Sequence, residues 1–293
     1  MASGGRRPFA GQALPLQKRQ GELKRLFIYL LLVLGAAAFC VPFVWTVSAA
    51  LKTASEYHAS PERLIPTHPT LGNFGKAWTA LPFGVFVRNT VVVTLLTTVG
   101  QTISSALVAY GFARFEFRGR NLLFGLLLAT MMLPGQVTQI PVFMIWRELH
   151  AIDTFVPLVL PAFLGGAFNV FLLRQFLMGV PRELDEAAMV DGAGPVRVWW
   201  SVLLPAMGPA LATVGVFTFL GAWQDFEGPL IYLNSPTHYT VAIGLRMFQD
   251  TFGGDFEQVM AATLVHIVPT ILVFFLAQRF FVKGIATSGL GGR

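Results

Sequence analysis

The sequence has little charge and a single cysteine, and both shortages restrict what the protein can be. Only 12% of its 293 residues are charged, whereas 54% are hydrophobic. This balance is typical of membrane proteins and not of soluble domains. Cys40 has no second cysteine to pair with, so no disulfide can form within the chain. Its place in an apolar stretch predicts a packed thiol.

Motifs for metal and nucleotide chemistry are also missing. The sequence contains no GxxxxGK[ST] motif, so we expect no ATP binding and no cofactor on this chain. The histidines lack the paired spacing of a metal site. They are His58, His68, His150, His238 and His266. The net charge of +6 needs no nucleic-acid partner, because basic residues at the ends of membrane spans account for it.

Six apolar segments are each near or above the roughly 20 residues that a bilayer requires. They cover residues 26–51, 89–113, 121–146, 155–173, 198–224 and 258–278. Lipid offers no partner to an unpaired backbone group, so all six are predicted to be helices. The first lies too far from the N-terminus to be a removed signal peptide. The fold class is therefore an all-α membrane protein with six spans.

Lysine and arginine placement predicts the orientation. If both termini are cytoplasmic, roughly 15 of the 21 basic residues lie inside. The predicted parts are then a flexible cytoplasmic segment at 1–25, an external loop at 52–82, a core at 83–282 and a cytoplasmic tail at 283–293. A polar insert at 179–205 also falls on the cytoplasmic side.

The polar insert predicts a helix, a glycine turn and a second helix. Pro181 suits the first turn of a helix, and the acids at 183, 185 and 186 favour its positive end. Gly192 ends this helix after about ten residues. On it, Leu184, Ala187 and Ala188 share one face, where the alanines allow close approach of a partner. The second helix opens at 194–195 and carries Trp199 and Trp200 toward the membrane.

The spacing in this insert is familiar. Glu186-Ala187-Ala188, three residues, Gly192, nine residues and then 202–205, Val-Leu-Leu-Pro, resembles the EAA loop of permease subunits from ATP-binding-cassette importers, with valine in place of isoleucine. A helix lying on the bilayer surface would explain the acids and tryptophans, but it would not explain these fixed spacings.

Further segments resemble carbohydrate-type permeases, and in particular the shorter, second permease of maltose-type sugar importers. They are 70–74, 88–90, 132–134 with 139–141, 173–176, 234–236 with 239–240, and 281–284. The resemblance implies the type I importer permease fold with both termini cytoplasmic, in a multi-pass protein of the cell membrane. It implies as partners a homologous second permease, two copies of an ATPase that carry ATP and Mg, an extracytoplasmic solute-binding protein and a sugar.

In that family the EAA helix inserts into a cleft of the ATPase. By resemblance, Glu186 is the acidic anchor, Ala187 and Ala188 are the close-contact face and Gly192 is the turn. The full set of coupling residues is Glu183, Glu186, Ala187, Ala188, Asp191, Gly192, Leu204 and Pro205. The glycine-rich end at 284–293 either reaches the ATPase, as tails in the family can, or is an unordered terminus.

Polar and aromatic positions near the spans are candidates for the substrate path. They are Gln101, Ser105, Asn169, Trp223, Asp225 and His266. For Gln101 and Ser105, and for the neighbouring Ser104, the alternative is hydrogen bonding between helices. Glu227 stands where the family has an aliphatic residue, and it either alters the outer mouth or faces water.

Other functions stay open beside the import of a sugar. The same fold could carry a polyol, a glycerol phosphate or a phosphodiester, but a phosphorylated substrate predicts arginines along the path, and no predicted span places one there. A secondary transporter should show inverted halves or intramembrane carboxylates. An intramembrane enzyme should gather a nucleophile and base or metal ligands at one depth, and the scattered histidines argue against that.

Overall fold

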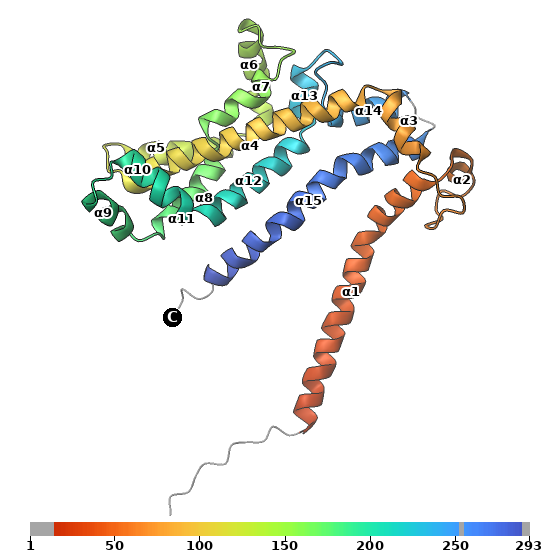
Figure 1. The fold of residues 1–293 in the computed structure, drawn as a ribbon, viewed down its shortest axis with the longest axis horizontal. Coiled ribbons are helices and arrows are strands. Elements are labelled where there is room, and N and C mark those ends of the chain that lie inside the picture. The colour runs from red at the N-terminus through yellow and green to blue at the C-terminus, as the bar shows by residue number, and fades with distance from the viewer. Residues whose placement is uncertain (1–14, 252–254, 289–293) are drawn as a thin grey trace, which may run out of the picture.

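The described part of the chain is entirely helical apart from its turns and loops. A computed structural model describes residues 15–251 and 255–288. Most helices form one elongated bundle, and the long first helix diverges from it (Figure 1). The helices are α1 (Pro15–Leu51), α2 (Ala54–Ala59), α3 (Gly72–Ala80), α4 (Phe83–Arg114), α5 (Arg120–Ala129), α6 (Gly135–Glu148), α7 (Val156–Val159), α8 (Ala167–Met178), α9 (Glu183–Val190), α10 (Pro195–Val198), α11 (Leu204–Ala206), α12 (Gly208–Trp223), α13 (Glu227–Tyr232), α14 (Val241–Thr251) and α15 (Phe256–Ser288).

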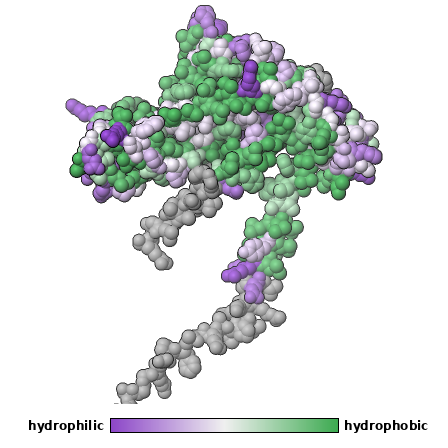
Figure 2. Space-filling model, viewed as in Figure 1, coloured by the Kyte–Doolittle hydropathy of each residue, from purple (hydrophilic) through white to green (hydrophobic). Residues whose placement is uncertain are grey.

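Four of the six predicted spans are single stretches long and apolar enough to cross a membrane. They are Lys24–Leu51, Phe83–Arg114, Val156–Met178 and Phe256–Gln278. Apolar side chains cover much of the face seen in Figure 2, as lipid contact requires. The third of these stretches contains 3-10 turns at Leu160–Leu164 between α7 and α8.

The other two predicted spans are broken, and the expectation of one continuous helix in each was wrong. The segment at 121–146 divides into α5 and α6, which are bent by 100°. Pro134 there is extended, with φ −61° and ψ 132°, and its ring cannot continue a helix. The segment at 198–224 is bent by 78° between Ala206 and Gly208, where Pro205 and Pro209 flank the break. Each bent pair can still count as one span.

Both ends of the described chain are more helical than expected. The helix α1 begins at Pro15, so the predicted flexible segment 1–25 is helical in its second half. At the other end, α15 continues to Ser288, beyond the predicted start of the tail at 283. The rest of that tail, including Arg293, lies outside the described residues.

The loop at 52–82 is more ordered than a polar connection. Lys52, expected in external water, is fully buried, and its ammonium donates to the carbonyls of Ser60 (2.9 Å) and Pro61 (3.1 Å). The amide of Asn73 donates to the carbonyls of Ala50 (2.8 Å) and Lys52 (2.7 Å). These bonds hold the loop against the C-terminal end of α1, and α2 and α3 pack against α15.

The helix α4 forms the axis of the bundle. Toward its C-terminal end, small buried residues such as Ala106 and Ala109 let α8 and α12 approach closely, with Leu173 and Leu203 in the same core. Toward its N-terminal end it carries Phe83 and Phe86, which pack with Val241 and Phe248 of α14 in a second core. One helix of 32 residues, about 48 Å long, therefore joins both ends of the molecule.

Two of the family-like segments meet in space. The amide of Asn89 donates to the carbonyls of Thr237 (2.9 Å) and Tyr239 (3.0 Å). The hydroxyl of Thr90 accepts from the backbone N–H of Val241 at 2.9 Å. These residues attach the start of α4 to the loop before α14, which gives the segments 88–90 and 239–240 a shared structural role.

Candidate functional site

The polar insert at 179–205, named the coupling loop for the role that its resemblance implies, has the helix and glycine turn that its sequence predicts. The helix α9 begins at Glu183 and has eight residues, so Pro181 precedes it and does not lie in its first turn as expected. Gly192 has φ +83°, the left-handed conformation that glycine adopts without strain. Its N–H bonds the carbonyl of Met189 (3.0 Å), and that of Ala193 bonds the carbonyl of Ala188 (2.9 Å). This pair of bonds is a Schellman motif.

The exposed face of α9 differs in part from the predicted one. Glu183, Glu186 and Ala187 are exposed, and so is Asp191 at the end of the helix. Ala188 is half-buried and packs against the main core, so only part of the predicted alanine face is free. Val190 is 87% exposed.

Several exposed apolar residues of the coupling loop were not predicted as contacts. They are Met189, Val190, Val196 and Trp200. Leu184, which the sequence places on the contact face, is exposed as well. Apolar residues inside an otherwise polar insert were the signal that could have identified them.

The second half of the loop also corrects one expectation. The chain passes from α10 through a π-helical turn, Trp199–Leu203, into α11. Trp199 is buried in the core and Trp200 is exposed, so the two tryptophans do not both face the membrane. Leu204 is half-buried against the core and Pro205 is exposed.

An ion pair attaches α9 to α4. Nε of Arg114, the last residue of α4, lies 2.6 Å from Oδ2 of Asp185, and the two side chains are only 7% and 10% exposed. Arg114 also donates to the carbonyl of Val180 at 3.0 Å. The Tyr110 hydroxyl, one turn earlier on α4, donates to the carbonyl of Pro195 at 3.1 Å. From the sequence, Asp185 was predicted only to favour the positive end of its helix. Its ion pair with Arg114 was not predicted.

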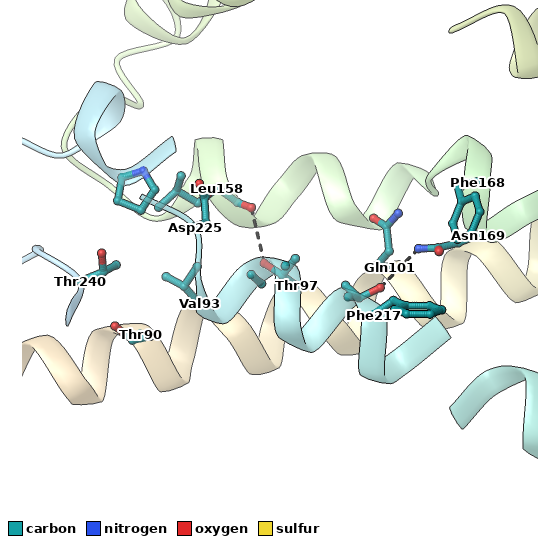
Figure 3. A pocket seen from close by; sticks show the side chains of 14 residues that line it. Thr90, Val93, Thr97, Gln101, Leu158, Phe168, Asn169, Phe217, Asp225 and Thr240 are labelled. Atoms are coloured by element: carbon teal, nitrogen blue, oxygen red, sulfur yellow. Dashed lines mark hydrogen bonds between the residues drawn. The ribbon is translucent and has the colours of Figure 1, made fainter. Parts of the chain in front are cut away.

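A cavity of about 400 Å³ lies further along α4. Residues of α4, α8 and α12 line it, together with the ends of α7 and α13. Figure 3 shows Gln101 and Asn169 turned toward one another, with Asp225 near the opposite end. These are three of the six residues predicted for the substrate path. Threonines supply most of the remaining polar lining: Thr90, Thr97, Thr218 and Thr240.

A chain of amide and hydroxyl groups crosses three helices at this cavity. With its amide oriented by its neighbours, Gln101 donates to the carbonyl of Ala162 (3.1 Å) and accepts from Nδ2 of Asn169 (3.2 Å). Asn169 also donates to the hydroxyl of Thr218 at 3.3 Å. These groups can exchange hydrogen bonds with a polar solute, as hydroxyl-rich ligands require.

Two carboxylates near the end of the cavity opposite Gln101 differ in their surroundings. Asp225 accepts from the N–H of Gly228 at 3.1 Å, and burial raises the pKa of its carboxyl. Glu227 is exposed and accepts from the amide of Gln139 at 3.2 Å. Both of its interpretations, an altered mouth and a side chain facing water, are compatible with this exposure.

The other three predicted path residues lie outside this cavity. Ser105 is buried and accepts from the N–H of Gly166 at 3.2 Å, while Ser104 donates to the carbonyl of Ala162 at 3.0 Å. Both serines join helices, as their alternative interpretation states. Trp223 stacks on His266, with ring centroids 5.8 Å apart, and its indole donates to the carbonyl of His266 at 2.9 Å.

Among the described residues, no group of three or more potential ligands could hold a metal ion.

Comparison with known proteins identifies the family. Residues 101–287 match the family model described as binding-protein-dependent transport system inner membrane component. The chain belongs to this family. It is thus a multi-pass permease component of a binding-protein-dependent ATP-binding-cassette importer, and it is not the ATPase.

Relatives of this permease are named for different solutes. This chain is 34% identical over 271 residues to the sn-glycerol-3-phosphate transport system permease protein UgpE of Yersinia pestis bv. Antiqua (strain Antiqua). The match covers 90% of this chain and 96% of the relative. This chain is 31% identical over 254 residues to the arabinooligosaccharides transport system permease protein AraQ of Halalkalibacterium halodurans, covering 86% and 91%. These matches confirm a permease of the sugar and glycerol-phosphate type.

Solved structures support the fold. A bacterial transporter involved in the import of the acidic polysaccharide alginate aligns with a TM-score of 0.81 and 22% identity, covering 94% of this chain and 100% of that one. A second structure, of an alginate transporter in complex with a pentasaccharide-bound periplasmic protein, aligns at 0.61 and 15% identity.

Proposed function

We propose that this permease is the shorter subunit of a heterodimer that imports a carbohydrate, driven by two ATPase subunits and supplied by an extracytoplasmic binding protein. Both termini and the coupling loop are cytoplasmic in this proposal. One observation supports it above the others: α4 carries both the attachments of the coupling loop, at Tyr110 and Arg114, and the wall of the polar cavity, at Thr97 and Gln101.

This arrangement lets a movement of the ATPase reach the cavity. An ATPase that grips α9 moves the buried ion pair and hence the end of α4, because a buried charge cannot leave its partner without a large cost. A packed helix moves as a unit, so the opposite part of α4 shifts against α8 and α12. In the proposal Glu186 is the anchor, Ala187 the close contact and Gly192 the turn that sets the direction of the loop.

The cavity favours a neutral, hydroxyl-rich solute. Amides, threonine hydroxyls and the rings of Phe168 and Phe217 line it, and none of its described lining residues is a lysine or arginine. A phosphate favours cationic donors, which the described lining lacks, and the carboxylate of Asp225 would repel it. Glycerol phosphate or a phosphodiester is the second candidate, because the UgpE relative is named for sn-glycerol 3-phosphate. A polyol would suit the same lining.

The test uses the complex reconstituted with its binding protein in proteoliposomes. Glu186→Ala should abolish most of the substrate-stimulated ATPase activity and uptake, because the ATPase loses its acidic contact. Glu116→Ala is the matched control, since Glu116 is an exposed acid in the loop after α4 and lies outside the coupling loop. Full stimulation with Glu186→Ala would contradict the proposed anchor.

The same liposomes discriminate the solutes. Uptake of oligosaccharides without uptake of glycerol phosphate supports the carbohydrate proposal, and the reverse result supports the second candidate.

A further inference from the structure

A second cavity, of about 620 Å³, lies beside the coupling loop and is strongly basic. It is bounded by the end of α4, the start of α5, the last turn of α8 and residues 179–183. Four arginines line it and one acid does: Arg114, Arg120, Arg174, Arg182 and Glu183. Hydrophilic side chains gather at this end of the molecule in Figure 2, around the position of α9 and α10 in Figure 1.

Arg114 and Asp185 neutralise one another, so the free charge of the cavity belongs to the other arginines. Arg174 donates from Nε to the carbonyl of Phe112 at 3.4 Å, and its guanidinium lies 4.2 Å from the ring centroid of Phe124. Arg120 donates from Nη1 to the carbonyl of Phe115 at 3.2 Å. Both side chains are half-buried. Carbonyls and rings orient a guanidinium but leave its positive charge in place.

No carboxylate in the described part of the chain lies within ion-pair distance of Arg120 or Arg174. Glu183 lines the same cavity but is exposed, and Arg182 beside it offsets its charge. Two half-buried guanidinium groups that line one cavity favour an anion with several oxygen acceptors.

The surroundings of the cavity identify the kind of anion. Arg174 lies four residues before the end of the span Val156–Met178. Arg120 is the first residue of the preceding span, which begins with α5. Two such span ends lie at the level of lipid headgroups. Exposed apolar side chains surround this region, including Met178 (56% exposed) and Leu122 (68% exposed). A soluble phosphate ester would leave these apolar groups uncovered, whereas acyl chains cover them.

We propose that this cavity binds the phosphate headgroup of an anionic phospholipid, with Arg120 and Arg174 as its ligands and the acyl chains along α5 and α8. The bound lipid stabilises the first residues of the coupling loop, because Val180, Arg182 and Glu183 line the same cavity. The proposal requires only that this end of the spans meets a headgroup layer, so it is independent of the solute that the permease carries.

The experiment is native mass spectrometry of the full chain, purified in detergent with its co-purifying subunits and mixed with phosphatidylglycerol. Diacylglycerol, which has no phosphate, is the lipid control. Each basic residue near an anionic membrane contributes about 1 kcal/mol, or roughly a fivefold change in binding. Arg120→Gln and Arg174→Gln should each lower phosphatidylglycerol retention about fivefold, and their combination should lower it about 25-fold.

Arg118→Gln is the matched control. Arg118 is an exposed arginine in the loop directly before Arg120 but does not line the cavity, so its replacement should leave retention unchanged. Arg174→Lys keeps the charge and should retain more lipid than Arg174→Gln. Unchanged elution and melting of each variant separate loss of the site from loss of the fold.

Three results would overturn the proposal. The first is equal retention of phosphatidylglycerol by the wild type and the double variant. The second is displacement of the lipid by millimolar sn-glycerol 3-phosphate, which would make this a site for a soluble phosphate ester. The third is loss of the ATPase subunit from the arginine variants without loss of lipid, which would assign the cavity to a protein contact.

Discussion

The position of α9 against α4 depends on the ion pair between Arg114 and Asp185. The pair is buried and attaches α9 to α4, the central helix of the bundle. Removing one member leaves the other charge buried without a partner, which costs far more than the pair itself contributes.

Asp185→Ala should therefore lower the free energy of unfolding by about 3 kcal/mol, measured by denaturation in detergent. Glu183→Ala is the control, because this exposed acid on the same turn has no ion pair among the described residues; it should change stability by less than about 0.5 kcal/mol. The double variant Arg114→Met/Asp185→Leu should recover most of the loss. Equal losses of stability in Asp185→Ala and Glu183→Ala would contradict a stabilising role for the ion pair.

Asp153 connects two loops at the opposite end of the molecule. Its Oδ1 accepts from the N–H groups of Asn234 and Ser235, both at 2.9 Å, and the Ser235 hydroxyl also donates to its carboxylate. Nδ1 of His238 lies 3.2 Å away. Burial raises the pKa of the Asp153 carboxyl, but the hydrogen bonds from Ser235 and Asn234 lower it further, so this pKa lies well below its usual range.

A pKa that is lowered on folding gives a defined pH dependence. The stabilisation by Asp153 is fully present above the unfolded-state pKa of about 3.9 and is lost as the pH falls from there toward the folded-state pKa. The melting temperature of the wild type should thus fall more steeply below pH 4 than that of Asp153→Asn. Glu148→Gln, which removes an exposed acid nearby in the sequence, should follow the wild type. Parallel curves for wild type and Asp153→Asn would contradict this role.

At the scale of elements, the glycine turn after α9 determines the direction in which the coupling loop leaves its helix. Gly192 adopts φ +83°, where a side chain with a Cβ costs roughly 1–2 kcal/mol. A β-branched residue would shift the chain out of this conformation and lose the Schellman bonds.

Gly192→Val should reduce ATP-driven uptake more than ATPase activity, because α9 remains helical but is presented at a wrong angle. The ratio of solute transported to ATP hydrolysed in proteoliposomes measures this loss. Gly194→Ala is the matched control: Gly194 has φ −74°, and an added Cβ there meets no atom within 4 Å. An unaltered ratio for Gly192→Val would remove the turn from the coupling mechanism.

At the scale of the whole molecule, α1 is the part that the rest of the chain covers least. None of the most apolar window of its span is buried, and only its last turns, near Ser48 and Ala49, pack against the bundle. In Figure 1 it leaves the bundle and extends away from the other spans. Such a helix can be covered by lipid or by a second permease.

Co-expression with the second permease should therefore stabilise this one. A partner present at a hundred times its dissociation constant adds about 2.7 kcal/mol to the stability of the folded state. We expect the two permeases to co-elute and to melt at a higher temperature than this chain alone, whereas a permease of another importer should have no effect. Identical melting with and without the partner would contradict the proposed heterodimer.

Much of the fold and part of the site could be predicted from local physics. Long apolar runs must be helical in lipid, because no other partner exists for their backbone groups, and helices make up most of all six runs, two of which are bent pairs. Gly192 was predicted to end α9, since glycine tolerates the left-handed conformation that ends a helix. The spacing around Glu186 indicated the family, and the match over residues 101–287 confirms it.

Only the tertiary structure decided which of these helical faces meet. It paired Arg114 with Asp185, and it brought Gln101, Asn169 and Asp225 to one cavity while leaving Trp223 and His266 at another. Each of these outcomes depends on contacts between segments far apart in the chain. A run of apolar residues determines that a helix crosses the membrane, but it leaves open how that helix rotates and tilts, because packing against neighbouring helices sets both.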